Sequence, residues 1–189
     1  MMNVYESCPV LRSQHFTLRL VEPEDAAVLL AVYSNAETIR LCNSDNCTYG
    51  FRLENLQQAQ ACIAAWRQEY AMGHFVRWAI LAENQVVGTV ELFHRVSQDA
   101  FNHHGLLRLD VHPDWENTSA LCELLTLLNR HAYELFGCPI IATKAPAFAA
   151  VRQQALRQCG YMPSASMLIG SDGTAYGDYW VRLQASPSK

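Results

Sequence analysis

The sequence of 189 residues is 50% hydrophobic and 17% charged, and it carries a net charge of -4 at pH 7. This composition excludes a disordered or low-complexity chain, and the length fits one compact domain over residues 1–189 with a sizeable core. The apolar stretches are far shorter than the roughly 20 residues of a membrane helix, and the N-terminus lacks the pattern of a signal peptide.

The charged residues, cysteines and histidines indicate which partners, compartment and metal sites to expect. The 14 basic and 18 acidic residues include no basic block, which argues against nucleic acid or a membrane as partner. The 7 cysteines are scattered without a C-x-x-C pair, so we expect reduced thiols and a cytoplasmic location. His103 and His104 are adjacent and point in different directions, so we expect no metal site.

The first half of the chain predicts one strand, three helices and a hairpin. An alternating strand covers residues 15–21, Pro23 and acidic neighbours open a helix, and a short helix covers 36–41. A polar, turn-rich loop covers 42–50, and the clearest amphipathic helix covers 53–72. The strands 75–82 and 86–93 then form a hairpin around residues 83–85.

The second half predicts a mixture of strands and helices. The strand 105–112 has an apolar face and a polar face, and the latter carries Arg108, Asp110 and His112. A helix with a leucine stripe ends at Phe136, the strand 139–143 and the helix 147–159 follow, and residues 167–169 form a final hairpin with 179–183. This order predicts an α/β (α+β) fold with a mixed sheet covered by helices on both faces.

Four stretches occur in the order and spacing of a known family. They are residues 17–20 with 23–25, residues 78–80 followed by 87–90, the segment LDVHPD at 109–114, and the segment LRQCGY at 156–161. Together they resemble the GCN5-related N-acetyltransferase (GNAT) superfamily, and within it the branch that acetylates ribosomal-protein N-termini. The resemblance implies a mostly antiparallel central sheet in which the strands 105–112 and 139–143 are parallel neighbours that splay apart.

The resemblance also implies acetyl-CoA as co-substrate. In the family, a glycine-rich turn presents helix N-terminal amides to the pyrophosphate. The residues implied at this site are Val111, His112, Asn117, Thr118, Ser119, Ala120 and Arg152.

This sequence departs from the family's glycine motif. Glu116, Ser119 and Leu121 stand at the motif positions, so side chains replace glycines and a negative charge lies beside the phosphates. Two alternatives follow. Either these side chains point away and leave the amides free, or Asn117 or Ser119 caps the amides itself and fills the site.

Acyl transfer to an amine needs a base, for which Glu91 and Asp110 on the central strands are the candidates. For Asp110 the alternative is a structural ion pair with Arg108, and for Glu91 it is a solvated or hydrogen-bonded strand residue. In the last long helix, Ala149, Arg152 and Leu156 stand where the resemblance implies Asn and then Ser or Tyr, so no obvious general acid remains there. Arg152 with Lys144 is either a phosphate contact or a solvated cation. Tyr176 and Tyr179 either line an acceptor pocket or pack in the core.

These features predict an N-acetyltransferase that transfers an acetyl group from acetyl-CoA to a primary amine, such as a protein N-terminus. The resemblance implies direct attack in a ternary complex, by a monomer or a homodimer. The alternative is a catalytically inactive protein of the same fold that binds a ligand or a protein.

Overall fold

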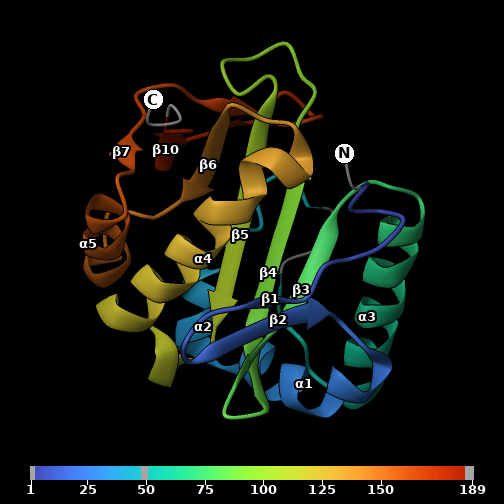
Figure 1. The fold of residues 1–189 in the computed structure, drawn as a ribbon. Coiled ribbons are helices and arrows are strands. Elements are labelled where there is room, and N and C mark those ends of the chain that lie inside the picture. The colour runs from blue at the N-terminus through green and yellow to red at the C-terminus, as the bar shows by residue number, and fades with distance from the viewer. Residues whose placement is uncertain (1–2, 48–50, 186–189) are drawn as a thin grey trace.

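The computed structural model describes residues 3–47 and 51–185. Within these ranges, one eight-stranded sheet runs through the molecule in the order β1-β2-β3-β4-β5-β6-β10-β7, and β8 and β9 form a separate pair (Figure 1). The strands are β1 (Leu11–Arg12), β2 (Phe16–Leu20), β3 (Val76–Ala82), β4 (Gln85–His94), β5 (His104–Val111), β6 (Ile140–Lys144), β7 (Met162–Pro163), β8 (Leu168–Ile169), β9 (Ala175–Tyr176) and β10 (Tyr179–Leu183).

The helices cover both faces of the sheet, as predicted. They are α1 (Ala26–Ser34), α2 (Ala36–Leu41), α3 (Leu56–Ala71), α4 (Thr118–Phe136) and α5 (Ala150–Gln158), with short 3₁₀ turns η1 (Pro23–Asp25) and η2 (Pro113–Trp115). Figure 1 shows α4 crossing one face of the sheet, with α5 beside it and α2 on the opposite side of β5. α1 and α3 pack together, against β4 and β3.

The sheet is antiparallel except at β5 and β6, which confirms the predicted parallel pair. Their register runs from His104 opposite Ile140 to Leu107 opposite Thr143, whereas β5 continues to Val111. Beyond Leu107, β5 therefore no longer pairs with β6. This separation is the splay that the resemblance implied.

The core differs between the two faces. Beneath α4 it is apolar, because the leucine stripe of that helix packs on Leu107, Leu109 and Val111 of β5. Beneath α1 and α3 it includes Trp66 and Tyr33 together with several buried charged groups. The polar face of the central strands is thus buried rather than solvated.

The β3–β4 connection is tighter than predicted. Gln85 already pairs with Ala82, so the turn consists of Glu83 and Asn84 alone. Both residues have positive φ, 50° and 65°, which is the conformation that a two-residue hairpin of this type requires.

The predicted pairing of the final hairpin is wrong. β8 pairs with β9, with Leu168 opposite Tyr176, around a turn in which Gly173 has a φ of 83°. Asp178, with a φ of 64°, then redirects the chain, and β10 joins β6 and β7 in the main sheet. The turn residues thus close the smaller β8–β9 hairpin, whereas the longer strand β10 pairs with β6, which is distant in sequence.

Candidate active site

Polar side chains line the sheet beneath α1 and α3, close to the point where β5 and β6 separate. In the strand register, Arg77 lies opposite Glu91, and Glu91 lies opposite Arg108. Thr89 lies opposite Asp110 two pairs further along. Period-two alternation places all five on one face, so three strands contribute to one buried network.

Glu91 is fully engaged in this network. It is only 2% exposed, and its two oxygens accept hydrogen bonds from Arg77 and Arg108. Burial raises the pKa of Glu91, but the two guanidinium groups outweigh it and hold the pKa below the ordinary value. The ring of Trp66 lies 4.1 Å from the guanidinium of Arg77. Glu91 is therefore an anchor for two buried cations.

Asp110 keeps one oxygen free. Its Oδ2 accepts a hydrogen bond of 2.9 Å from the hydroxyl of Tyr33 and lies 3.7 Å from Nη1 of Arg77. Its Oδ1 is buried and has no partner among the described residues. Burial and the charge of Asp110 raise the pKa of Tyr33 well above normal, so this phenol stays a donor.

The segment 42–47, between α2 and α3, covers this face. The carboxylate of Asp45 accepts from Nζ of Lys144 at 2.7 Å and from the hydroxyl of Tyr179 at 3.1 Å. Arg108 donates to the backbone carbonyl of Asp45 at 2.8 Å. Tyr179 is buried and Tyr176 half-buried. The segment is thus tied to β5, β6 and β10; the rest of the predicted loop, residues 48–50, lies outside the described residues.

The residues implied at the cofactor site lie together at the ends of β5 and α4. The carbonyl of Val111 accepts from the hydroxyl of Thr38 at 3.3 Å, and Nδ1 of His112 accepts from the amide of Asp114 at 3.4 Å. Oδ1 of Asn117 accepts from the amide of Ala120 at 3.0 Å and so caps α4. Of the two alternatives raised by the sequence, the structure has capping by Asn117, but only of the Ala120 amide.

Glu116 forms an ion pair with the buried Arg152 beside this cap. Nη2 and Nε of Arg152 lie 2.7 and 2.9 Å from the carboxylate of Glu116, and Nη1 donates to the carbonyl of Leu41 at 3.3 Å. Burial lowers the pKa of Arg152, but the hydrogen bond and charge of Glu116 outweigh it and raise the pKa. In this arrangement the site does not fit a pyrophosphate, because a carboxylate already holds the cation and a side chain caps the helix.

A pocket of about 210 Å³ adjoins this ion pair. Besides Glu116 and Arg152, its walls include Arg40, Phe148 and Val151. The guanidinium of Arg40 lies 4.7 Å above the ring of Phe148, and both side chains are more than half exposed. The pocket thus offers a cation and an aromatic face at the rim of the splay.

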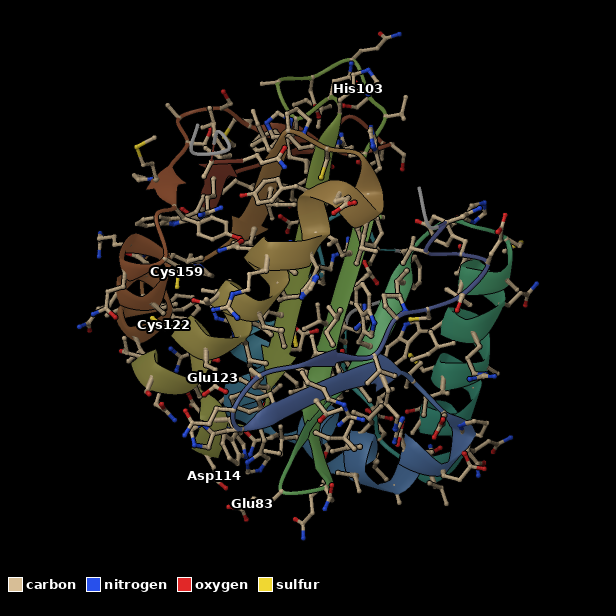
Figure 2. All side chains as sticks on the ribbon, in the orientation of Figure 1. Glu83, His103, Asp114, Cys122, Glu123 and Cys159 are labelled. Carbon is tan, nitrogen blue, oxygen red and sulfur yellow. The ribbon has the colours of Figure 1, made fainter. Side chains whose placement is uncertain are left out.

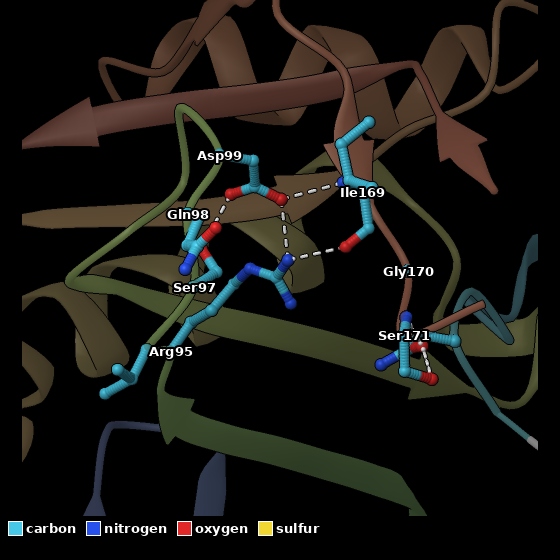
Figure 3. A pocket seen from close by; sticks show the side chains of 9 residues that line it. Arg95, Ser97, Gln98, Asp99, Ile169, Gly170 and Ser171 are labelled. Atoms are coloured by element: carbon cyan, nitrogen blue, oxygen red, sulfur yellow. Dashed lines mark hydrogen bonds and ion pairs between the residues drawn. The ribbon is translucent and has the colours of Figure 1, made fainter. Parts of the chain in front are cut away.

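A second pocket, of about 470 Å³, lies between the β4–β5 connection and β8 (Figure 3). Burial raises the pKa of Asp99, but hydrogen bonds from Arg95 at 2.6 Å, Ser97 at 2.7 Å and the amide of Ile169 at 2.7 Å outweigh it. The pKa of Asp99 therefore lies far below normal. These groups satisfy one another and fasten β8 to the main sheet, so we assign no chemistry to this pocket.

Cys122 and Cys159 meet between α4 and α5 (Figure 2). Sγ of Cys122 lies 3.3 Å from Oε1 of Gln158, and that of Cys159 lies 3.6 Å from the carbonyl of Cys122. Burial and Cys122 raise the pKa of Cys159 to about 11, which makes it a poor nucleophile. Over the described ranges, no three His, Cys, Asp or Glu side chains are grouped to hold a metal, and no helix is long and apolar enough to span a membrane.

A parallel strand pair that separates beside a helix N-terminus is the arrangement that the resemblance to the N-acetyltransferase class of fold implied. The sequence model of the acetyltransferase (GNAT) domain matches residues 15–162. The chain therefore belongs to this family and is an acyltransferase, which confirms the resemblance. No curated protein sequence matches the chain.

Several solved structures have the same fold. Mycobacterium smegmatis RimJ in complex with CoA-disulfide has a TM-score of 0.69 and 15% identity, over 92% of this chain and 84% of that one. An acetyl transfer enzyme of Salmonella typhimurium, which modifies the N-terminal serine of ribosomal protein L7/L12, has a TM-score of 0.65 and 13% identity, over 93% of this chain and 99% of that one. A GNAT-family acetyltransferase from Bacillus anthracis has a TM-score of 0.68 and 11% identity, over 93% and 99%.

Several residues of this site were not singled out from the sequence. The sequence does indicate a special role for Arg77, because it is a charged residue inside an otherwise apolar strand. Nothing in the sequence indicated a role for Tyr33 or Asp45, because their roles depend on how α1 and the segment 42–47 dock on the sheet.

Proposed function

We propose that this acyltransferase transfers an acetyl group from acetyl-CoA to a primary amine, and that the amine is a protein N-terminus. The acceptor class is supported by fold relatives that are named as acetyltransferases of ribosomal proteins. The observation that carries the chemistry is Asp110, whose buried Oδ1 has no partner among the described residues at the point where β5 leaves β6.

In this proposal Asp110 is the general base. An amine attacks an acyl carbon only when it is neutral, so a carboxylate with a free oxygen serves by taking the proton from the ammonium. Tyr33 holds the other oxygen at 2.9 Å, and Arg77 donates to the Tyr33 hydroxyl at 3.1 Å. Glu91 fixes Arg77 and Arg108, and thus acts as a positioning residue.

Direct attack of the amine is supported by the state of the nearby thiol. Burial and the charge of Asp110 raise the pKa of Cys42 far above its ordinary value. A thiol that stays protonated is a poor nucleophile, so a covalent intermediate on Cys42 is disfavoured. We further propose one cytoplasmic acyltransferase domain over 1–189; the seven cysteines are free thiols, which supports a reducing compartment.

The variant Asp110→Asn tests the base. It keeps the size of the side chain and the acceptor for Tyr33, so we expect turnover to fall about 100-fold or more. Acetylation of N-terminal peptides by acetyl-CoA, followed by mass spectrometry, gives the rate, and thermal denaturation checks folding. Tyr33→Phe, which leaves the carboxylate in place, is expected to lower turnover much less. Unchanged turnover in Asp110→Asn removes Asp110 from the mechanism.

A further inference from the structure

The Glu116–Arg152 ion pair bridges the two diverging strands. Glu116 follows β5 through η2, whereas Arg152 lies in α5, which follows β6. The two strands stop pairing after Leu107 and Thr143, so the pair closes the gap that their divergence opens. Arg152 also donates to the carbonyl of Leu41 at the end of α2. Three segments thus meet at one guanidinium.

Arg152 is buried, and Glu116 is only slightly more exposed. The Arg152 side chain is 8% exposed and that of Glu116 is 12% exposed. A buried guanidinium requires a counter-anion, because an isolated charge is costly to desolvate. Here the counter-anion is a carboxylate of the chain itself.

Glu116 also lies beside the N-terminus of α4, which attracts anions. Asn117 caps the amide of Ala120, while the amides of Thr118 and Ser119 have no acceptor within the described residues. A buried arginine and free helix amides are the groups that bind phosphate. A pocket of about 210 Å³ adjoins the ion pair.

We propose that the Glu116 carboxylate is an internal occupant of an anion site, and that a diphosphate binds Arg152 and the α4 N-terminus only by displacing it. The identity of the diphosphate as that of CoA rests on the proposed function. Glu116 is then a residue that sets affinity: it lowers donor binding because each anion must compete with it for Arg152. The new anion replaces the lost charge, so the exchange leaves Arg152 paired.

Glu116→Gln removes the competing charge with little change of shape. Isothermal titration with inorganic pyrophosphate, and separately with CoA, gives the affinities. We expect both ligands to bind at least about tenfold more tightly to this variant than to the wild type, because the competing state is lost. Glu116→Gln combined with Arg152→Gln removes the cation as well, and is expected to lose the gain.

Glu37→Gln is the matched control. Glu37 lines the same pocket and carries the same charge, but it is exposed and pairs with Arg40 at 3.5 Å. Removing it frees no buried cation, so both affinities should stay within about twofold of the wild type. An equal gain in Glu37→Gln would show a general charge effect and overturn the proposal.

Glu116→Asp covers the case in which Glu116→Gln fails to fold. It keeps the charge and retracts it by one methylene, so we expect a smaller gain for pyrophosphate. Unchanged affinity in the folded Glu116 variants overturns the proposal, even if the wild type acetylates amines. Conversely, a gain for pyrophosphate without acetyl transfer sustains the anion site and refutes the proposed function.

Discussion

Arg77, Glu91 and Arg108 form a buried row of alternating charge across β3, β4 and β5, and Asp110 adds a second negative charge at its edge. Two guanidinium groups are thereby balanced by two carboxylates. Buried charges are stable only when they are paired and hydrogen-bonded. The row explains how the carboxyl group of Asp110 is tolerated in a buried part of the molecule.

Glu91→Gln tests the role of Glu91 as an anchor. The change leaves Arg77 and Arg108 without their shared counter-charge, so we expect the free energy of unfolding at pH 7 to fall by about 3–5 kcal/mol. Urea denaturation measures it. Glu54→Gln, in the exposed pair with Arg52 at 3.8 Å, should have no measurable effect. A loss in Glu91→Gln no larger than that in Glu54→Gln contradicts the anchor role.

For single residues, the sequence predicted the face of the sheet to which a side chain points, but not the residues that it contacts. Alternation placed Glu91 opposite in direction to Val90 and Leu92, and Asp110 opposite to Leu109, and both face the polar side of the sheet. That Tyr33 holds Asp110, across 77 positions of sequence, depends on helix docking. Local patterns contain no such information.

At the level of secondary-structure elements, β4 and β5 approach each other closely at Gly88. A Cβ at this position would lie 2.1 Å from the backbone oxygen of Asp110 and 2.8 Å from Cα of Val111. Only glycine avoids this overlap, so Gly88 is the residue that lets β4 press against the end of β5. The absence of a side chain at Gly88 therefore determines how closely β5, the strand that carries Asp110, lies to β4.

Gly88→Ala should push β5 away from β4. Because the colliding atoms are backbone, we expect a loss of about 1–3 kcal/mol or more in the free energy of unfolding. Turnover should fall as well, since Asp110 moves. Gly137→Asn is the control: Gly137 closes α4 with a φ of 57° and open space around it, and asparagine tolerates that conformation. Equal stability of Gly88→Ala and wild type would refute the close approach.

The sequence predicted the long elements well, because each has a strong local period. The leucine stripe predicted α4, which begins at Thr118 because Asn117 caps it. The helix predicted over 53–72 is shorter, since Asn55 caps it at Leu56. The two-residue strands β7, β8 and β9 have no period of their own, and the partner of β10 lies on β6. The pairing of short strands is set by tertiary contacts.

The molecule as a whole is asymmetric about its sheet. The face beneath α4 is apolar and supplies stability, whereas the face beneath α1 and α3 contains the charged row and Asp110. The segment 42–47 and the Glu116–Arg152 pair both close the region where the strands separate. The structure therefore represents a closed arrangement, in which the chain's own carboxylates, Asp45 and Glu116, hold the cations around the splay.

The charged row also determines how the molecule responds to acid. The pKa of Glu91 is lower in the folded protein than the value of about 4.3 of an unfolded glutamate. A carboxylate with a lowered folded pKa contributes stability that is present above its unfolded pKa and is lost as the pH falls through its folded pKa. Asp99 and Glu123, whose pKa values are also lowered, act in the same direction.

We therefore expect the free energy of unfolding to be nearly constant from pH 7 to about pH 5, and to fall steadily below that. The difference between wild type and Glu91→Gln should be largest near neutral pH and should shrink as acid protonates Glu91, because a neutral glutamate and a glutamine then leave the two guanidinium groups equally unpaired. Urea denaturation of both proteins at pH 7, 5, 4 and 3 measures this difference. Glu54→Gln, in the exposed pair with Arg52, should follow the wild type throughout. A difference that stays constant or widens toward pH 3 would show that the stabilising effect of Glu91 is not due to its charge.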